Sequence, residues 1–477
     1  MEVRPVIQVA AQTPRNDPSW GVSARTLGIL LGLVPLPPDV TLSRLSTDSR
    51  DIRPGDLFVA LPGERVDGHD FVAQAFQSGA LAALVERPVA GLPDSAVCLA
   101  VPSTLDALTL IAGWWRNQVD PLVLAITGSN GKTTVKEMLS CILAADARAR
   151  GIDPASELLA TQGNFNNHLG LPLTLLRLRH GHRRAVLELG MNHAGELASL
   201  SRLARPRIAL VNNVQRAHVG LLGSLEAVAD AKAEIFGGLE PSGTAVINAD
   251  DGFAERLARA ARGRHILRYS AELTADVGPL LAVQAEPGGQ HIVLRVAGHE
   301  HAFHLPVPGR HNVANAMAAI AMATAIGIPV QAACEALQGF SGVSGRLQSR
   351  LAPSGATVID DTYNANPDSV LAAIRVLAAR PGTRILVLGD LGELGEGAPA
   401  MHAELGAACR AAGIDHFFGL GTYVRGAAEA FGHDAEVSDD VEALCARIRP
   451  LLDGQVTVLV KGSRFMRMER VVAGLCT

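Results

Sequence analysis

The residues with the clearest chemistry form the run TGSNGKTT at positions 127–134, between an apolar stretch and an amphipathic one. Gly128 and Gly131 let backbone N–H groups converge on phosphate oxygens, and a helix that begins here adds partial positive charge. The Lys132 ammonium would reach the terminal phosphates, and the Thr133 hydroxyl would bind magnesium. The run therefore predicts a nucleotide-binding phosphate loop. The predicted contact residues are Gly128, Ser129, Asn130, Gly131, Lys132, Thr133 and Thr134.

One position departs from the strict phosphate-loop pattern. That pattern places a first glycine five residues before Gly131, where this chain has Ile126. A chance glycine-rich turn is the alternative interpretation. The Gly-Lys-Thr sequence between a predicted strand and a predicted helix argues against that alternative.

Three residues downstream have side chains suited to a metal site. Glu188 closes an apolar run, and its carboxylate is a ligand of the kind that magnesium accepts, although a surface carboxylate is the alternative. His218 follows another apolar run, where a lone histidine is more often structural. Lys232 lies in a helical pattern and, taken alone, is typical of a solvated helix charge.

Two segments rich in amide side chains suggest contact with polar ligands. Residues 161–170 either form a long loop with Asx turns or grip a polar substrate. Residues 360–367 follow a predicted strand and place carboxylates and amides at the carboxyl edge of a sheet, where open α/β sheets bind ligands. Residues 389–395 and 461–464 also follow strands. The segment 389–395 lacks the GxGxxG spacing, so we predict no dinucleotide site there.

The elements that position these residues follow from short apolar runs bounded by turn residues. Residues 71–79 and 312–326 have helical patterns, and residues 135–143 present one apolar helical face. The alternation of strands and helices predicts an α/β fold. The predicted strands are 56–61, 81–85, 122–127, 185–189, 208–211, 244–247, 357–360, 384–388 and 456–460.

We predict three domains. Residues 1–118 would form a small α/β domain, residues 119–344 a central ATPase domain with a parallel sheet, and residues 345–477 a doubly wound, Rossmann-like domain. The length of 477 residues agrees, because about 150 residues per domain gives about three domains.

Composition excludes several classes of protein. A hydrophobic fraction of 48% excludes a disordered chain, and a net charge of −5 disfavours a broad nucleic-acid surface. An aromatic fraction of 4% argues against base stacking on single strands. We expect no membrane span, no targeting leader and no nucleic-acid partner. The six scattered cysteines indicate reduced thiols and a cytoplasmic protein.

In this order along the chain, the motifs resemble those of the Mur ligases of peptidoglycan synthesis. The resemblance runs from about residue 46 to the C-terminus, and the family's own phosphate loop lacks the outer glycine, which accounts for Ile126. DDTYNANPDS and LGDLGELG are typical of the D-alanyl-D-alanine-adding branch, and the Asp-Asn-Pro-Arg mark of the diaminopimelate-adding branch is absent. The motifs are STDSR (46–50), TGSNGKTT (127–134), GNFNNHLGLPLTLL (163–176), ELGMNHAGEL (188–197), AKAEIF (231–236), GRHNVANAMAA (309–319), DDTYNANPDS (360–369), LGDLGELG (388–395) and VKGSR (460–464).

The resemblance implies a three-domain amide ligase that uses ATP, and we expect the protein to be a monomer. Its first domain would hold the UDP end of a nucleotide-sugar peptide, its central domain ATP and magnesium, and its third domain the amine substrate. The reaction would join UDP-N-acetylmuramoyl-tripeptide to D-alanyl-D-alanine through an acyl phosphate, with release of ADP and phosphate.

The resemblance also implies roles for the candidate catalytic residues Lys132, Lys232 and His218. Lys132 and two magnesium ions would neutralise the phosphates. Thr133 and Glu188 would bind one ion, and His218 would help to bind the second. Lys232 matches the family lysine that carries a carbamate, whose anionic oxygen is a metal ligand.

The remaining site residues are implied in the same way. Asn248 and Asn312 would lie near the adenine, Arg346 near the phosphates, and Asp361 near the ribose or phosphates. Substrate contacts are expected in three places. They are Ser49 and Arg50 for the UDP end, Asn166 and Asn167 for the peptide carboxylate, and Asn364, Asn366 and Ser463 for the amine substrate.

Three alternative functions remain open at this point. The nearest is another Mur ligase or a folylpolyglutamate synthase-like amide ligase with the same ATP site. A second is a regulatory protein that senses or hydrolyses ATP without ligation. The third, a nicotinamide oxidoreductase, is disfavoured because the dinucleotide fingerprint is missing.

Overall fold

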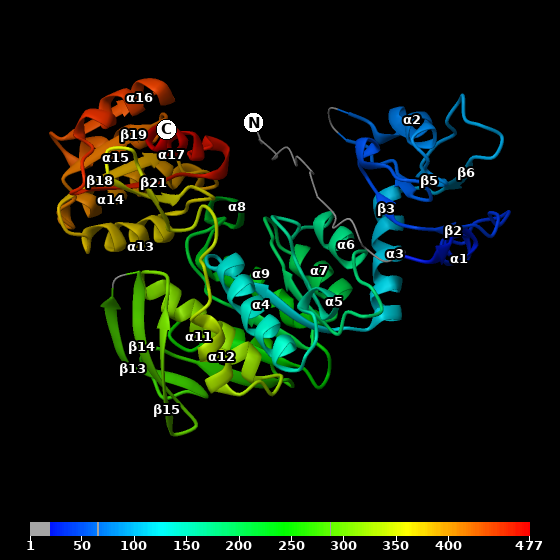
Figure 1. The fold of residues 1–477 in the computed structure, drawn as a ribbon, viewed down its shortest axis with the longest axis horizontal. Coiled ribbons are helices and arrows are strands. Elements are labelled where there is room, and N and C mark those ends of the chain that lie inside the picture. Colours follow the sequence, from blue (N-terminus) through cyan, green and yellow to red (C-terminus); the bar gives the residue numbers. More distant parts are fainter. Residues whose placement is uncertain (1–19, 64–65, 287) are drawn as a thin grey trace. The chain divides into compact units, whose positions relative to one another are not determined.

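The computed structural model describes residues 20–63, 66–286 and 288–477 (Figure 1). They form two compact units. The N-terminal unit contains the described residues up to Pro121 together with Thr161–Arg184, and the large unit contains Leu122–Ala160 and Ala185–Thr477. Residues 1–19, which we assigned to the start of the first domain, lie outside the described residues.

The N-terminal unit is built on a small parallel sheet with strand order β3-β4-β5-β6. The predicted strands 56–61 and 81–85 are confirmed as β4 and β5, and the predicted helix 71–79 is confirmed as α2. The elements are β1 (Val22–Ser23), α1 (Ala24–Leu30), β2 (Thr41–Leu42), β3 (Leu45–Ser46), β4 (Leu57–Val59), α2 (Val72–Gln77), β5 (Ala82–Val85), β6 (Val97–Ala100), α3 (Thr104–Val119) and α6 (Gly170–Leu175).

The segment 161–184 packs with the N-terminal unit, although the predicted bounds place it in the central domain. Its helix α6 contacts α3, and the Trp115 indole N–H donates to the Leu178 carbonyl oxygen at 2.9 Å. Trp115 also meets the His180 ring edge-on, with ring centroids 5.3 Å apart. The bounds of the three domains stay a prediction.

The large unit contains a nine-stranded central sheet with the order β15-β14-β13-β12-β11-β10-β7-β9-β8. The predicted strands at 122–127, 185–189, 208–211 and 244–247 are confirmed as β7, β9, β10 and β11. The strands are β7 (Leu122–Thr127), β8 (Leu158–Ala160), β9 (Arg184–Glu188), β10 (Ile208–Val211), β11 (Thr244–Asn248), β12 (His265–Tyr269), β13 (Val277–Glu286), β14 (Gly289–Val296) and β15 (His299–Leu305).

The central sheet is not wholly parallel. From β7 through β10, β11 and β12 to β13 the pairing is parallel, whereas β13, β14 and β15 pair antiparallel. Along β14, Ile292, Leu294 and Val296 are buried at every second position, so one face of this extension joins the core. Our prediction of a parallel sheet missed this antiparallel part.

Helices cover the central sheet and complete its core. Helix α4 carries the predicted apolar face, with Val135, Met138, Leu139 and Ile142 at most 1% exposed, and it contacts α11 and α12. The predicted helix 312–326 is confirmed as α11. The helices are α4 (Lys132–Ala149), α5 (Pro154–Glu157), α7 (Glu196–Ala204), α8 (Val219–Leu222), α9 (Leu225–Ala233), α10 (Ala254–Ala260), α11 (Arg310–Thr324) and α12 (Val330–Leu337).

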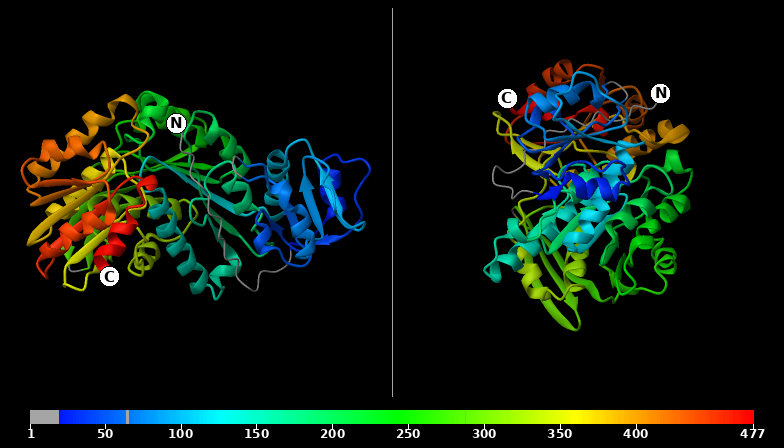
Figure 2. Two further views of the ribbon diagram at one scale, coloured as in Figure 1. Left: turned by 90° about the horizontal axis from the view of Figure 1, so that it is seen from above. Right: turned by 90° about the vertical axis from the view of Figure 1, so that its right-hand side faces the viewer.

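The C-terminal sheet of the large unit has the order β16-β17-β21-β18-β19-β20, and only its edge strand β16 is antiparallel. Alternate strand residues enter two separate cores, one with α13, α14 and α15 and one with α16 and α17. Helices thus lie on both faces, which confirms the doubly wound prediction (Figure 2). The elements are β16 (Gln348–Leu351), β17 (Thr357–Asp361), α13 (Pro367–Ala378), β18 (Thr383–Gly389), α14 (Ala398–Ala411), β19 (His416–Leu420), α15 (Val424–Phe431), β20 (Ala435–Ser438), α16 (Val441–Ile448), β21 (Val456–Lys461) and α17 (Glu469–Cys476).

Loops from the central and C-terminal sheets meet closely within the large unit. Arg216 is held by two carboxylates of the C-terminal side, Asp368 at 2.9 Å and Glu404 at 2.7 Å. Beside it, the Gly220 N–H donates to the Glu393 carbonyl oxygen at 3.1 Å. No helix among the described residues is long and apolar enough to cross a bilayer.

The contact at Gly220 leaves no room for a side chain, which gives a test of this interface. A Cβ on Gly220 would lie 2.6 Å from the Leu394 carbonyl carbon and 2.7 Å from the Glu393 carbonyl oxygen. Gly220→Ala should therefore separate the short helix α8 from the loop that contains Glu393 and Leu394, and expose Arg216. Trypsin should cleave after Arg216 about tenfold faster in this variant, because cleavage follows the population of the open form.

The matched control is Gly237→Ala. Nothing lies within 4 Å of a Cβ at Gly237, and its backbone lies outside the left-handed region. Its cleavage rate should equal that of the wild type. Equal cleavage rates in Gly220→Ala and Gly237→Ala would contradict the close contact.

Candidate active site

The phosphate loop leaves the carboxyl end of β7 and enters α4. Gly128 has φ +150° and Gly131 has φ +79°, backbone conformations that favour glycine. Gly131 also lies against the amides of Asn212 and Asn315, where a Cβ would be 2.6 Å from Asn212 Nδ2. The predicted strand, loop and helix are thus confirmed, and both glycines are needed for the shape of the loop.

Residues that follow β10 hold this loop through side-chain and backbone groups. The Asn130 N–H donates to Asn213 Oδ1 at 2.8 Å, and the Ser129 hydroxyl donates to the Gln215 carbonyl oxygen at 3.0 Å. Asn212 donates to the Asn130 carbonyl oxygen at 3.0 Å. Sequence reasoning missed these roles, although the pair Asn212-Asn213 directly follows a predicted strand.

Lys132 begins α4, and its ammonium donates to the Gly128 carbonyl oxygen at 2.8 Å. Burial lowers the pKa of this lysine, and the positive charge of Arg346 lowers it further, while Glu188 and Glu393 act in the opposite direction. Two cations and two carboxylates therefore interact at one end of the phosphate loop.

Thr133, Glu188 and Arg346 form the centre of the site. The Thr133 hydroxyl donates to Glu188 Oε2 at 2.8 Å, and Arg346 Nη2 donates to Thr133 Oγ1 at 2.8 Å. Glu188 is 3% exposed at the end of β9, and the Arg346 guanidinium lies 4.4 Å from the centre of the Tyr363 ring. Three of the predicted residues are thus brought into direct contact.

Among the described residues, some buried polar atoms of the candidate site and of the adjoining strand β7 lack a hydrogen-bond partner in the protein. They include Arg346 Nε and the Thr127 hydroxyl oxygen. Buried polar groups are normally satisfied, so a polar ligand at this place would supply what the protein does not. No group of three or more His, Cys, Asp or Glu side chains is placed to hold a metal within 20–63, 66–286 and 288–477.

Lys232 lies in α9 and is 1% exposed, so it is not the solvated charge that a helical pattern alone would suggest. Burial lowers its pKa well below the ordinary lysine value, and the nearby charge of Lys132 lowers it further. The site therefore favours the neutral amine of Lys232.

His218 lies beside Glu393 of the C-terminal side, with Nδ1 and Oε2 2.7 Å apart. The hydrogen bond with His218 lowers the pKa of Glu393, and the charge of Lys132 acts in the same direction. Both residues have positive φ, 61° for His218 and 63° for Glu393. Sequence reasoning missed the role of Glu393, although this carboxylate lies in the motif at 388–395.

The residues expected near the adenine join a buried amide network. Asn312 is 6% exposed, its amide donates to the Pro308 carbonyl oxygen at 2.7 Å, and it accepts from Asn315 at 3.3 Å. Asn315 in turn accepts from Asn212 at 3.0 Å. Asn248 ends β11, and its side-chain oxygen accepts from the Asp250 N–H at 3.1 Å. Contact of Asn248 and Asn312 with adenine stays a prediction.

On the C-terminal side, Asp361 is paired with the buried Lys461 at 2.6 Å. Ser463 is 4% exposed, and its hydroxyl lies between the Gly392 N–H at 2.9 Å and the Ala365 carbonyl oxygen at 3.2 Å. Asn364 Oδ1 accepts from the Ala365 N–H at 2.9 Å. These side chains thus already have protein partners, and their ligand contacts stay predictions.

Four further predicted substrate residues lie in the N-terminal unit. Arg50 is paired with Asp48 at 2.8 Å on the surface, and Ser49 begins the same short 3-10 helix. Asn167 Oδ1 accepts from the N–H groups of Leu169 and Gly170, which places it at the start of α6 beside Asn166. The Asx-turn interpretation of this segment is therefore confirmed for Asn167.

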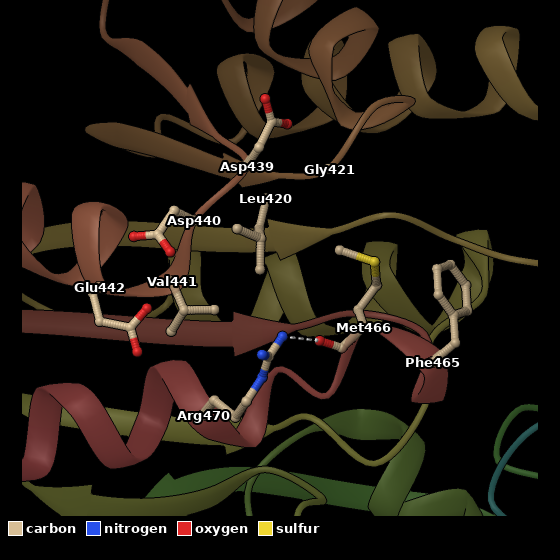
Figure 3. A pocket seen from close by; sticks show the side chains of 9 residues that line it. All are labelled: Leu420, Gly421, Asp439, Asp440, Val441, Glu442, Phe465, Met466 and Arg470. Carbon is tan, nitrogen blue, oxygen red and sulfur yellow. Dashed lines mark hydrogen bonds between the residues drawn. The ribbon is translucent and has the colours of Figure 1, made fainter. Parts of the chain in front are cut away.

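A cavity of about 230 Å³ opens at the carboxyl ends of β19 and β20 (Figure 3). Asp439, Asp440 and Glu442 line it together with Arg470, whose guanidinium donates to the Met466 carbonyl oxygen at 3.2 Å. None of the predicted site residues lines this cavity. Asp439 is also paired with Arg425 at 2.8 Å.

Comparison with known proteins gives consistent matches along the chain. The Mur ligase family, catalytic domain, matches residues 41–104, the Mur ligase middle domain matches 126–323, and the Mur ligase, glutamate ligase domain matches 345–464. The chain is 41% identical to UDP-N-acetylmuramoyl-tripeptide--D-alanyl-D-alanine ligase of Escherichia coli (strain K12), over 92% of this chain and 94% of that protein.

Solved structures agree. MurF from Acinetobacter baumannii has a TM-score of 0.88 at 34% identity and covers 96% of this chain and 99% of its own. MurF ligase from Thermotoga maritima, solved in complex with ADP, has a TM-score of 0.79 at 28% identity and covers 91% and 96%. The three-domain fold predicted from the sequence is therefore confirmed.

Lys132→Ala tests the role assigned to the phosphate loop. It removes the loop's ammonium and little apolar packing, so ATP turnover should fall by at least about 100-fold while the melting temperature stays near that of the wild type. Steady-state kinetics and thermal unfolding measure the two effects. Near-normal turnover with unchanged ATP affinity would contradict the assignment.

Proposed function

Because the chain belongs to the Mur ligase family, we propose that it joins UDP-N-acetylmuramoyl-tripeptide to D-alanyl-D-alanine and converts ATP to ADP and phosphate. The observation that carries the proposal is the contact of Thr133, Glu188 and Arg346 beside Lys132. A relative with this activity, matched over nearly its whole length, supports the same substrates.

The chemistry explains why cations gather at this place. A carboxylate is a poor electrophile, so an oxygen of the peptide carboxylate attacks the γ-phosphorus of ATP, ADP departs, and an acyl phosphate forms. The free amine of the dipeptide then attacks the acyl carbon, loses a proton and expels phosphate. Two anions must meet in the first step, and Lys132 and Arg346 would reduce their repulsion.

Magnesium fits the residues present. The Thr133 hydroxyl and the Glu188 carboxylate are hard oxygen donors 2.8 Å apart, and magnesium is usually held by one or two carboxylates together with substrate phosphates. A cage of three protein carboxylates is therefore not required. Bound magnesium would neutralise the charge of the phosphate groups, and His218 and a modified Lys232 would help to hold a second ion.

We propose a carbamate on Lys232. A carbamate forms when a neutral amine takes up carbon dioxide, and the burial of Lys232 favours that neutral amine. The modification would turn a buried cation into an anionic oxygen ligand. It also gives a reason for a lysine among groups that bind magnesium.

The substrate contacts are proposed by unit. Ser49 and Arg50 would contact the UDP end, Asn166 and Asn167 the peptide carboxylate, and Asn364 and Ser463 the amine substrate. We also propose that residues 1–118, 119–344 and 345–477 act as three domains of a cytoplasmic monomer, since the substrates and ATP are cytoplasmic metabolites.

The direct test is mass spectrometry of the product formed from ATP, D-alanyl-D-alanine and the UDP-linked tripeptide. Tripeptides ending in diaminopimelate and in lysine should both be offered, together with other amino acids as amines. The proposal predicts one adduct of the tripeptide and the dipeptide with equimolar ADP. Product formed only with another amine would instead support a different Mur ligase or a folylpolyglutamate synthase-like enzyme.

Lys232→Ala tests the carbamate. The variant should be at least about 100-fold less active, and a small carboxylic acid such as formate should restore part of the activity by occupying the vacant ligand position. Kinetic assays with increasing formate measure the rescue. Full activity of Lys232→Ala without added acid would contradict the proposal.

Lys232→Arg is the matched control for this rescue. The guanidinium keeps its charge at all accessible pH values and fills the space of the missing group. Formate should therefore not restore this variant. Equal rescue of both variants would show that formate acts somewhere other than at position 232.

A further inference from the structure

Two amide side chains link the phosphate loop to the C-terminal sheet within the large unit. Asn366 Nδ2 donates to Asn130 Oδ1 at 2.8 Å, and Asn130 Nδ2 donates to Asn366 Oδ1 at 3.2 Å. Asn130 lies in the phosphate loop, whereas Asn366 is the N-cap of α13. The reciprocal pair thus joins two elements that are far apart in the sequence.

Every polar group of Asn130 has a partner in the protein. Its N–H donates to Asn213, its carbonyl oxygen accepts from Asn212 at 3.0 Å and from Asn213 at 3.1 Å, and its second amide hydrogen goes to Gln215 Oε1 at 2.6 Å. Only the pair with Asn366 reaches the C-terminal side. The side chain of Asn130 is therefore engaged by the protein, and its contact with the nucleotide stays a prediction.

Asn366 performs two tasks with one side chain. Its Oδ1 accepts from the Ser369 N–H at 3.0 Å and closes a capping box with the Ser369 hydroxyl, while its Nδ2 is directed to Asn130. The side chain is 9% exposed. The first turn of α13 carries Asp368, which pairs with Arg216 from the segment after β10. The start of α13 thus docks against the loops of the central sheet.

We propose that Asn366 is a positioning residue that orders the phosphate loop when the C-terminal sheet docks, and that it does not bind the amine substrate. The same docking brings Arg346 to Thr133. The inference rests on the proposed ligase function for its kinetic consequences, while the order of the loop is a property of the protein alone.

Asn366→Asp separates the two tasks. Aspartate caps a helix as well as asparagine does, so α13 keeps its cap. The variant lacks the donor to Asn130 and places a carboxylate oxygen against the Asn130 amide oxygen. The loss of this one hydrogen bond and the repulsion between the two oxygens should lower kcat for ligation about tenfold, with the KM for D-alanyl-D-alanine unchanged.

Ser369→Ala is the matched control. It removes the Ser369 hydroxyl from the capping box and leaves the Asn130–Asn366 pair intact. Ser369→Ala should lower the melting temperature and leave kcat unchanged. Asn366→Asp should instead lower kcat and leave the melting temperature near that of the wild type. If Asn366→Asp lowers the stability and leaves kcat unchanged, Asn366 serves only as the N-cap of α13, and the proposal is overturned.

Hydrogen exchange in the ligand-free protein gives a readout that does not need ligation. Amides of residues 127–134 should exchange faster in Asn366→Asp than in the wild type, and at the wild-type rate in Ser369→Ala. Faster exchange in a protein that forms no ligation product would support the positioning role and refute the ligase. Unchanged exchange in a protein that ligates would overturn only the positioning role.

A double-mutant cycle completes the test. In the background of Asn130→Ala, Asn366→Asp should change kcat by less than about twofold, because its partner is already absent. An additive loss would overturn the proposal. A raised KM for the dipeptide with normal loop exchange would place Asn366 in the amine pocket and would also overturn it.

Discussion

The contact of Thr133, Glu188 and Arg346 is the interaction on which the site depends. It joins the start of α4, the end of β9 and the segment after α12, with Thr133 accepting from Arg346 and donating to Glu188 at 2.8 Å each. A reaction between two anions needs fixed positive charge in a place where water screens it little. Part of that charge comes from Arg346, which lies just before β16 of the C-terminal sheet. The central sheet and its helices therefore do not supply the whole site.

Close backbone contact makes this shared site possible. Gly220 packs against the Glu393 and Leu394 backbone, and Asn130 meets Asn366 in a reciprocal amide pair. Each contact pairs a loop at the carboxyl edge of the central sheet with a loop or helix start of the C-terminal sheet. In addition, Glu393 Oε2 lies 2.7 Å from His218 Nδ1. Charged groups as well as amides therefore meet between the segments that follow the two sheets.

The sequence predicted the parts of this protein that local pattern determines. Buried strands such as β7 are visible in the sequence as continuous apolar runs. The glycines of the phosphate loop indicated a tight turn, and both have the positive φ angles that favour glycine. The antiparallel strands β13 to β15 were missed, as was the packing of α6 on α3, since both depend on contacts between distant residues. The burial of Lys232 was equally invisible, because a helical pattern does not show which charged residue faces the core.

The central claim is that the peptide carboxylate is activated as an acyl phosphate. The measurement is the fate of 18O placed in the terminal carboxylate of the UDP-linked tripeptide, followed by mass spectrometry of the released phosphate during ligation to D-alanyl-D-alanine. The account predicts that each phosphate carries one 18O atom, because the attacking carboxylate oxygen leaves with the phosphoryl group. Phosphate without 18O, in a reaction that still forms the amide, would contradict it.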